Sequence, residues 1–381
     1  MRLGLGLTAL LAAAAVSLTT GCSTLAYYGQ AVSGHLDLVQ RARPVPDWLA
    51  DPATPAPLRE RLALSQQMRD FAIAELALPD NRSYRRYADL GREAVVWNVV
   101  AAPELSLTLK TWCFPVVGCV GYRGSFKRAP ADATAAELRA QGYETHVYGV
   151  PAYSTLGKTD WLGGDPLLNT FINWSEPDLA ALIFHELAHQ VVYVDDDTEF
   201  NESYATAVER LGRARWLERR GDVPATQAQE AARERRDGYR DDFRLLTRRT
   251  REALQDLYAS DLPDADKRQR KALLLDVLRA DHAALKAGAW GGYTGYDRWM
   301  AGVNNAQLAV QAAYDAQVPA FERLFEREGR DFTRFHRAVR DIAALPKDRR
   351  RATLAALAEG RDPSAAGSAP TPALAPSPRS P

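Results

Sequence analysis

The chain has few cysteines and histidines, and it has no net charge. Three cysteines and six histidines occur among 381 residues, and 48 basic residues balance 48 acidic ones. This balance argues against the broad positive field that attracts nucleic acid, so we expect no nucleic-acid partner. After one apolar run near the start, from Leu3 to Leu18, no later stretch is long enough to predict a transmembrane helix.

The first residues have the pattern of an export signal. Met1-Arg2 precedes the apolar run, and the small residues Thr19-Thr20-Gly21 precede Cys22. This predicts a signal peptide over residues 1–21. The Gly21-Cys22 junction resembles a bacterial lipobox, which implies that Cys22 carries a lipid. Ser23 resembles the residue that follows the cysteine in outer-membrane lipoproteins, which implies a bacterial envelope protein facing the periplasm. An ordinary cleaved signal peptide is the alternative.

If Cys22 carries lipid, two cysteines remain. Cys113 and Cys119 are close in sequence, with Pro115 and Gly118 between them. An even pair in an exported chain predicts a disulfide. Two reduced, buried thiols are the alternative.

The most informative segment is His185-Glu186-Leu187-Ala188-His189, the pattern H-E-x-x-H. On a helix, residues four apart share a face, so His185 and His189 would direct two imidazoles to one point. Two side chains that bind the same tetrahedral zinc ion must converge on one point in this way. Glu186 lies beside them and could act as general base on a water at the open side of the metal.

The residues around this segment predict a buried helix. Ser175 is a candidate N-cap, Pro177 suits an early helical position, and the helix is expected to run to about Tyr193. Its flanks are apolar on nearly all sides, which is typical of a buried helix. Buried polar side chains need partners, and a metal would supply them. An amphipathic helix with polar residues near its surface is the alternative.

A third protein ligand is expected, because catalytic zinc usually has three. Apolar residues from Phe200 onward recur at helical spacing and predict a second helix, with Glu202 in its first turns. Across a tight connection Glu202 could reach the two histidines. Glu199 and Glu209 are rival candidates.

The HELAH segment followed by Asn201-Glu202 resembles the gluzincin metallopeptidases, whose third ligand is the glutamate of an Asn-Glu pair. The resemblance implies three zinc ligands and a general base: His185, His189 and Glu202, and Glu186. The acidic residue expected four positions after that glutamate is replaced by Thr206. The group that orients the histidines therefore stays unassigned.

A second resemblance covers most of the chain after the signal. The sequence is similar to a bacterial lipoprotein family described as predicted aminopeptidases, which implies peptide substrates. The matching stretches are Thr111–Pro115, Gly118–Gly124, Ala152–Gly157, Leu168–Phe171, the HELAHQ run, Phe200–Ser203 and Val303–Ala306.

Periodicity predicts an α+β fold. Apolar spacing predicts a helix over 57–78, and β-branched residues predict strands over 95–100 and 144–150. We expect a zincin-like domain, in which a small sheet lies beside the metal-binding helix and its edge, Tyr148–Thr155, pairs with an extended peptide. An interior strand without a substrate role is the alternative.

From about Pro224 onward the pattern is helical, with a break at Leu262-Pro263-Asp264. The expected organisation is a signal peptide at 1–21, a lipid-anchored tether at 22–50, a catalytic domain at 51–222, a helical domain at 223–361 and a disordered tail, rich in proline, alanine and serine, at 362–381.

Several residues are candidates for substrate binding. Tyr153, Tyr293 and Tyr296 could stabilise a developing oxyanion, as could a histidine, His146, His282 or His336. Asn304 and Asn305 could hold the substrate backbone or its terminal amine. An N-cap and a packing asparagine are the alternative for this pair.

The sequence thus predicts a zinc-dependent, lipid-anchored peptidase, most simply an aminopeptidase. One alternative is an endopeptidase that cleaves envelope proteins or peptidoglycan peptides. Another is a non-catalytic lipoprotein scaffold with a structural metal, against which Glu186 weighs, since a structural site needs no base.

Overall fold

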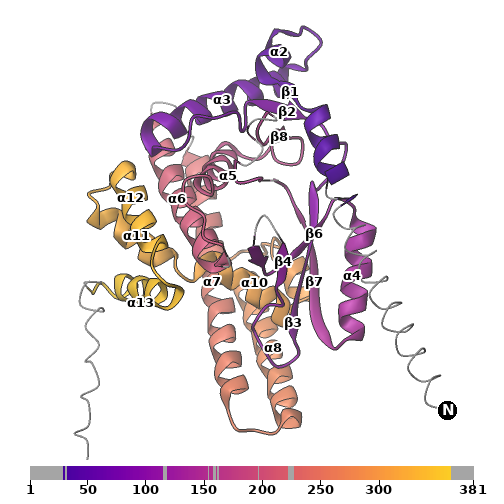
Figure 1. The fold of residues 1–381 in the computed structure, drawn as a ribbon. Coiled ribbons are helices and arrows are strands. Elements are labelled where there is room, and N and C mark those ends of the chain that lie inside the picture. Colours follow the sequence, from indigo (N-terminus) through magenta and orange to yellow (C-terminus); the bar gives the residue numbers. More distant parts are fainter. Residues whose placement is uncertain are drawn as a thin grey trace, which may run out of the picture.

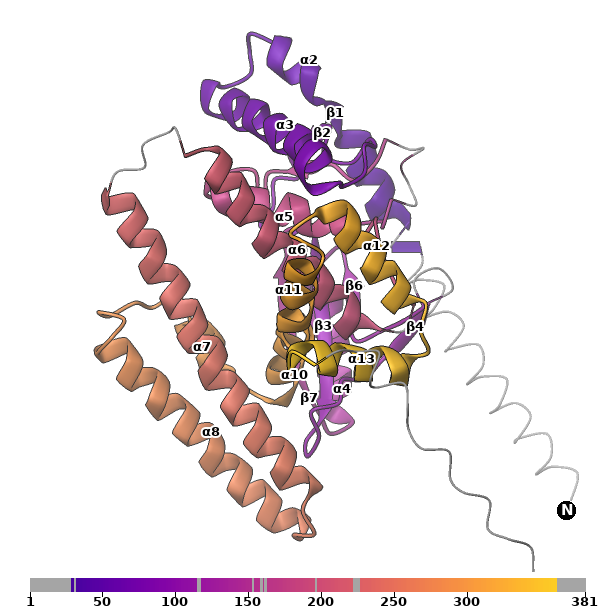
Figure 2. The same cartoon turned by 90° about the vertical axis from the view of Figure 1, so that its left-hand side faces the viewer.

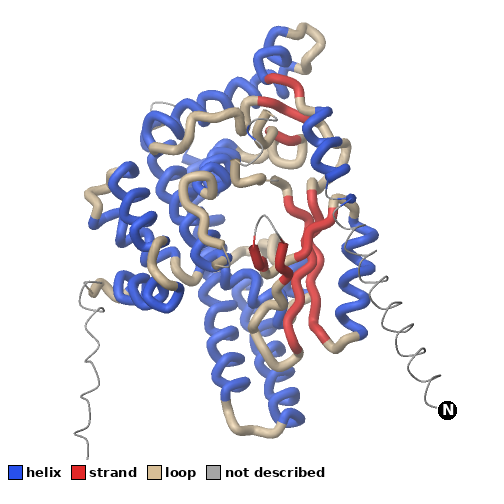
Figure 3. The backbone as a smooth tube through the Cα atoms, in the orientation of Figure 1, coloured by secondary structure: helices blue, strands red, loops and turns tan. Residues whose placement is uncertain are grey.

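The computed structural model describes residues 29–30, 32–114, 118–152, 154–157, 160, 163–195, 197–221 and 227–361. The described chain is α+β, with many helices and small sheets (Figure 3). The expected signal peptide, the lipidation site Cys22 and the tail at 362–381 lie outside these residues.

A three-stranded antiparallel sheet has β3 (Val96–Pro103) at its centre. β6 (Arg123–Ser125) pairs with one side of β3, and β7 (Tyr143–Val150) pairs with the other along its whole length. The structure therefore confirms the strands predicted around 95–100 and 144–150. The sequence pattern identified them because β-branched and aromatic residues fit a pleated, half-buried surface.

Helices cover both faces of this sheet. Successive side chains of β3 point to opposite faces, so alternate residues pack on different helices. Val99 and Ala101 pack on α4 (Arg128–Ala140), while Val100 and Ala102 pack on Ala306 of α10 (Asn305–Asp315). Figure 1 shows α4 on the outer side of the sheet and α10 toward the other helices.

The expected edge strand is present but shorter than predicted. β7 is an edge of this sheet, and it ends at Val150 rather than continuing to Thr155. Pro151 follows, and proline lacks the N–H group that a further ladder bond would need. Beyond it, Thr155 is held by Asp165, whose carboxylate accepts hydrogen bonds from the Thr155 N–H and hydroxyl.

The H-E-x-x-H motif lies at the end of α5 (Glu176–Ala188), which packs antiparallel to α6 (Thr198–Arg219). Near the start of α5, Glu176 accepts a hydrogen bond from the indole of Trp216 near the end of α6, at 3.0 Å. Gly212 allows close packing of α6, since a Cβ there would lie 2.9 Å from the Phe184 ring. α3 (Ala56–Leu76), predicted at 57–78, lies across this pair (Figure 1).

α5 ends at Ala188, five residues before the predicted end at Tyr193. The amides of Gln190 and Val191 bond to carbonyls three residues back, which tightens the chain into turns. The backbone of Val194 is bonded to a side chain of α6 and cannot continue the helix. The predicted end at Tyr193 was wrong, because the apolar spacing continues past Ala188 and does not indicate the contact between Val194 and α6.

Two long helices form a hairpin that extends from one end of the molecule (Figures 1 and 2). They are α7 (Gln227–Ala259) and α8 (Asp264–Ala287), separated at the predicted break. The short α9 (Asp297–Ala301) follows. Buried residues of this region form their own apolar cluster around Trp290 and Phe243.

The last three helices pack against the first half of the chain. They are α11 (Val318–Arg327), α12 (Phe332–Ala343) and α13 (Lys347–Ala358), and Figure 2 shows them beside α6. One apolar core cluster joins them with α3, α5 and α6. This core therefore contains residues from both sides of the boundary expected at residue 222.

Short strands complete the fold. β1 (Arg43–Pro44), which leads directly into α2 (Val45–Ala50), pairs with β2 (Arg86–Ala88), and β2 pairs in parallel with β8 (Leu167–Leu168). β4 (Trp112–Phe114) and β5 (Gly118–Val120) form a separate ribbon.

Candidate metal centre

The two motif histidines lie at the C-terminal end of α5. Ser175 caps the helix as predicted, with its hydroxyl accepting the amide of Asp178. His189 is the C-cap residue and keeps a right-handed helical backbone, so it still lies one turn beyond His185. The two rings meet edge to face with centroids 4.9 Å apart, and both side chains are buried. The local helix geometry thus directs both imidazoles to one place.

Glu202 completes a group of three donor residues with these histidines. It lies in the second turn of α6, which begins after the N-cap Asp197. Its Oε2 is 3.3 Å from Nε2 of His185 and 3.7 Å from Nε2 of His189. One ligand atom from each of the three residues lies within 4.8 Å of the others.

The spacing of these atoms fits a metal ion. Two ligands at about 2.1 Å from a tetrahedral ion are separated by roughly 3.4 Å. The two His–Glu distances, 3.3 and 3.7 Å, are close to that value. Two imidazole nitrogens and one carboxylate oxygen also form a donor set common in catalytic metal sites. These three residues could therefore hold a metal and leave a fourth position open.

The rival glutamates are placed differently. Oε2 of Glu209 lies 3.1 Å from Nδ1 of His185, the ring nitrogen that does not face Glu202. Glu199 lies in the first turn of α6 and does not belong to the group of donor residues found in the described chain. Of the three candidates, Glu202 is the one that the fold brings to both histidines.

The environments of the two histidines differ. Burial lowers the pKa of His189 to about 4, an effect that nearby Glu202 opposes and His185 reinforces. Burial also acts to lower the pKa of His185, but its hydrogen bonds to Glu202 and Glu209 raise that pKa well above the ordinary value. His189 is therefore a neutral imidazole near neutral pH, the form that binds metal.

Glu186 is partly buried beside the group of donor residues and has an unusual pKa. Burial raises the pKa of its carboxyl to about 7, and His185 opposes this while Glu202 adds to it. A hydrogen bond with the Ser154 side chain favours the ionised form. A carboxyl whose pKa lies near neutrality can both accept and donate a proton, as a general base that later acts as an acid must.

The connection between α5 and α6 is held by Asn201. Its side-chain oxygen accepts the Val194 amide at 2.8 Å, and its side-chain nitrogen donates to the Val194 carbonyl at 2.7 Å. In the sequence, Asn201 is part of the Asn-Glu pair that carries the family resemblance. Its contact with Val194 was not predicted. Its position just before Glu202 was the available signal.

Three tyrosines that the sequence analysis did not single out lie near the candidate centre. Burial raises the pKa of Tyr122 and Tyr148, and the carboxylate of Glu202 contributes to both shifts. The ring of Tyr193 stands edge-on to that of His189, with centroids 6.3 Å apart. They come from separate segments, so no local pattern in the sequence groups them.

The tyrosines chosen from the sequence lie elsewhere or are not described. Tyr153 lies outside the described residues. Tyr293 stacks on Tyr239 in the apolar cluster of the α7–α8 hairpin, and Tyr296 stacks on Phe243 there. A role for Tyr153, Tyr293 or Tyr296 in stabilising an oxyanion stays a prediction.

The other histidines are also outside that group. His146 stacks on Tyr148, and His282 meets the edge of Trp290. His336 bonds through its two nitrogens to the hydroxyl of Tyr204 and the carbonyl of Leu76.

Asn304 and Asn305 join the sheet to the helices. The side chain of Asn304 caps α10 by accepting the Gln307 amide, and its nitrogen donates to the Thr145 carbonyl. Asn305 is fully buried, donates to carbonyls of the loop after β3 and accepts the hydroxyl of Tyr258. These are the cap and packing roles weighed above as the alternative, and a role in substrate binding stays a prediction.

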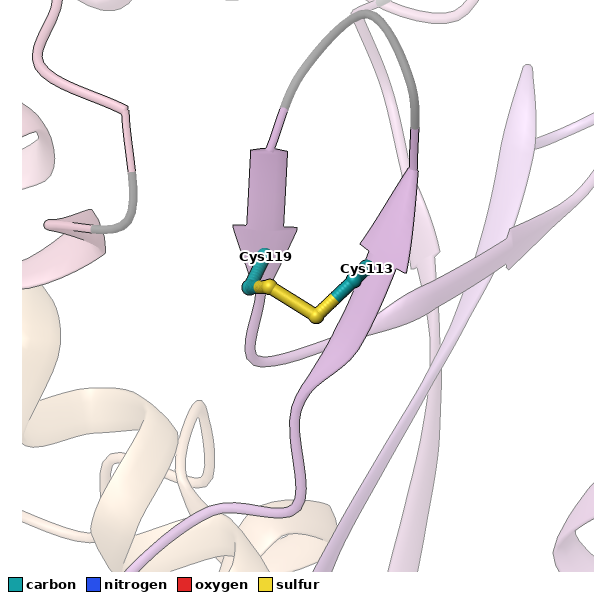
Figure 4. The surroundings of a disulfide bond; sticks show 2 residues. All are labelled: Cys113 and Cys119. Atoms are coloured by element: carbon teal, nitrogen blue, oxygen red, sulfur yellow. A yellow bond between two sulfur atoms is a disulfide. The ribbon is translucent and has the colours of Figure 1, made fainter.

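Cys113 and Cys119 form a disulfide between β4 and β5 (Figure 4). They face each other in the register of the two strands. The structure thus contains the disulfide that the pair of cysteines predicted.

No helix in the described part of the chain is both long and apolar enough to cross a bilayer.

Comparison with known proteins assigns a family. Residues 26–354 match a family model described as "Putative aminopeptidase", and this range includes every residue of the candidate centre. Searches of curated proteins and of solved structures give no match. Because the matched range spans most of the chain, the protein belongs to this family of aminopeptidases described as putative.

Proposed function

We propose that this chain is a zinc-dependent peptidase with a zincin-like site, and that it removes residues from the amino end of peptides. The observation that carries the proposal is the convergence of His185, His189 and Glu202, whose ligand atoms lie within 4.8 Å, beside Glu186, whose pKa is raised to about 7. A structural metal site needs ligands but no adjacent base. The pairing of a donor triad with such a base therefore favours catalysis.

The residues have distinct roles in this mechanism. His185, His189 and Glu202 would hold the ion, which when bound supplies Lewis acidity and lowers the pKa of water toward about 7. Glu186, with a pKa of about 7, accepts a proton from the attacking water. It then donates that proton to the leaving amine as the peptide bond breaks. Ser154 holds the Glu186 carboxylate through a hydrogen bond.

Aminopeptidase activity, rather than internal cleavage, follows from the family description. An enzyme of this kind requires a free amino terminus, whereas an endopeptidase accepts a blocked one. The choice therefore depends on the substrate and is testable with matched peptides.

The test uses full-length protein purified in detergent, with zinc measured per chain. Wild type and Glu186→Gln are compared on one peptide in unblocked and N-acetylated form. We expect zinc in both proteins and cleavage only by wild type, only of the unblocked peptide, with a rate loss of about 10²- to 10⁴-fold in the variant. Cleavage of the acetylated peptide would identify an endopeptidase. Zinc without cleavage of either would favour a scaffold.

We also propose that the protein is anchored in the bacterial envelope through a lipid on Cys22. The support is the Gly21-Cys22 junction after an apolar segment. Mass spectrometry of the amino-terminal peptide tests this, since acylation on Cys22 is expected and a Cys22→Ala variant should lose it and leave the membrane fraction.

A further inference from the structure

His185 lies between two carboxylates of the same helix. Its Nε2 is 3.3 Å from Glu202 Oε2, and its Nδ1 is 3.1 Å from Glu209 Oε2. The two nitrogens of an imidazole point away from each other, so a group bonded to Nδ1 cannot bind an ion that is held by Nε2. Glu209 therefore contacts the metal-binding histidine from behind.

The spacing of the two glutamates on α6 explains this arrangement. Residues seven apart lie on one face of a helix, two turns from each other. α6 packs antiparallel to α5, and the face of α6 that carries both glutamates lies against His185. Glu202 contacts one ring nitrogen of His185, and Glu209, two turns further along, contacts the other. Thr206, between them, carries no carboxylate and is buried. The carboxylate that faces Nδ1 of His185 thus belongs to Glu209, about one turn further along α6 than Thr206.

The part of α6 that carries Glu209 is held by neighbouring helices. Arg210 of α6 is 3.6 Å from Glu322 of α11, and Arg213 of α6 is 3.5 Å from Asp237 of α7. These contacts tie the segment around Glu209 to α7 and α11.

We propose that Glu209 is a positioning residue for the metal centre: by accepting the Nδ1–H of His185 it holds the ring with Nε2 directed at the ion. This inference rests on the proposed function. A carboxylate behind a metal-bound imidazole fixes its tautomer and orientation and makes it a stronger ligand. His189 has no such support in the described residues, where its Nδ1 is buried without a hydrogen-bond partner. Glu209 thus acts on one of the two imidazole ligands.

The first experiment measures zinc affinity by competition with a chromophoric chelator, using full-length protein in detergent. Loss of an outer-shell partner typically costs 10- to 100-fold in metal affinity. We expect about 10-fold weaker binding for Glu209→Gln, which can still accept a bond, and close to 100-fold for Glu209→Leu, which cannot. Glu218→Gln, an exposed glutamate of the same helix, is the matched control and should bind like wild type.

Stoichiometry distinguishes positioning from damage to the fold. A misfolded fraction would reduce zinc per chain, whereas a poorly held ring reduces affinity at a constant one zinc per chain. Wild-type affinity in both Glu209 variants would overturn the inference and leave the proposed function intact. Absence of zinc from wild type would overturn both.

A second readout does not require zinc. With ¹⁵N-labelled histidine, the Nδ1–H proton of His185 should appear as a downfield, exchange-protected resonance in wild type and in Glu218→Gln. It should be lost in Glu209→Leu. Persistence of the resonance in that variant would show that another group holds the ring, which contradicts the proposal.

Discussion

Asn201 forms two hydrogen bonds with the backbone of Val194, one through each end of its side-chain amide, at 2.8 and 2.7 Å. A side chain in the first turns of α6 is thus bonded to the backbone of the segment that joins α5 to α6, just after the HELAH residues. The residue after Asn201 is Glu202, the proposed third ligand, so this contact helps to set where the carboxylate lies relative to the histidines.

Replacing Asn201 with alanine should lower both stability and zinc affinity. The Val194 amide and carbonyl would lose their partners, which costs about 1–3 kcal/mol in the free energy of unfolding. The loosened connection would also hold Glu202 less well. Urea denaturation and chelator competition measure the two effects.

Asn169→Ala is a matched control for this variant. Asn169 makes the same kind of double contact, accepting the Leu90 amide and donating to the Arg92 carbonyl, and neither partner adjoins a proposed metal ligand in the chain. A similar loss of stability with unchanged zinc affinity is expected. Equal loss of zinc affinity in both variants would show that Asn201 has no specific part in the centre.

Substitution of Glu202 and of its rival Glu199 should rank the two as zinc ligands. Glu202→Gln removes a charged ligand and should weaken zinc binding by more than the roughly 10- to 100-fold expected for an outer-shell partner. Glu199→Gln should have little effect, since Glu199 lies outside the donor group in the described chain. Zinc titration of the purified variants gives the order, and a larger loss at Glu199 than at Glu202 would refute the assignment.

Arg350 links the C-terminal helix to the start of α6. Its guanidinium bonds to one oxygen of Asp197 at 2.7 and 2.9 Å, and both side chains are buried. Arg350→Met should destabilise the protein by about 3–5 kcal/mol, because a buried carboxylate is left without its partner. Urea denaturation measures the loss.

A double variant tests the cause. Asp197 also caps α6 by accepting the Phe200 amide, and asparagine can do the same without charge. Arg350→Met combined with Asp197→Asn should therefore recover part of the stability that Arg350→Met alone loses. No recovery would mean that packing, rather than the isolated charge, dominates.

His336 should make the protein less stable in mild acid. Burial lowers its pKa to about 4, the Leu76 carbonyl opposes this shift and Arg340 adds to it. An unfolded histidine has a pKa near 6.5, so between about pH 6.5 and 4 the unfolded chain binds a proton that the folded chain does not. Stability is thus fully present above about pH 6.5 and falls toward pH 4, by roughly 3 kcal/mol at most.

The measurement compares unfolding free energies at pH 7 and pH 4.5. His336→Gln should be less stable at pH 7, because it loses the paired contacts with Tyr204 and Leu76. It should also show a smaller decrease between the two pH values than wild type. An identical decrease would place the acid sensitivity on other groups.

Much of the fold was predictable from local patterns. Apolar spacing predicts α3 and α6, because each has an apolar stripe, and Pro263 marks the break between α7 and α8. β-branched and aromatic residues predict β3 and β7, because these side chains fit a pleated sheet. The end of α5 was not predicted. The helix ends at Ala188 and turns follow it, up to Val194, whose backbone bonds to Asn201 of α6. Apolar spacing continues past Ala188, so it does not mark this end.

The candidate centre divides in the same way. Two histidines four apart on one helix converge by helix geometry alone, and the glutamate between them follows from the same five residues. The choice among Glu199, Glu202 and Glu209 needed the antiparallel packing of α5 on α6, since helical spacing places all three within a few turns. The tyrosines near Glu202 come from separate segments and become neighbours only when the sheet packs near α6.

The sequence by itself determined the chemistry available to this protein: two imidazoles on one face of a buried helix, a base beside them and a nearby acidic helix. Tertiary structure decided which carboxylate faces the ligand nitrogens and which lies behind His185. Local sequence sets which residues share a helix face, but only packing between helices sets the rotation and register that bring one glutamate to Nε2 and another to Nδ1.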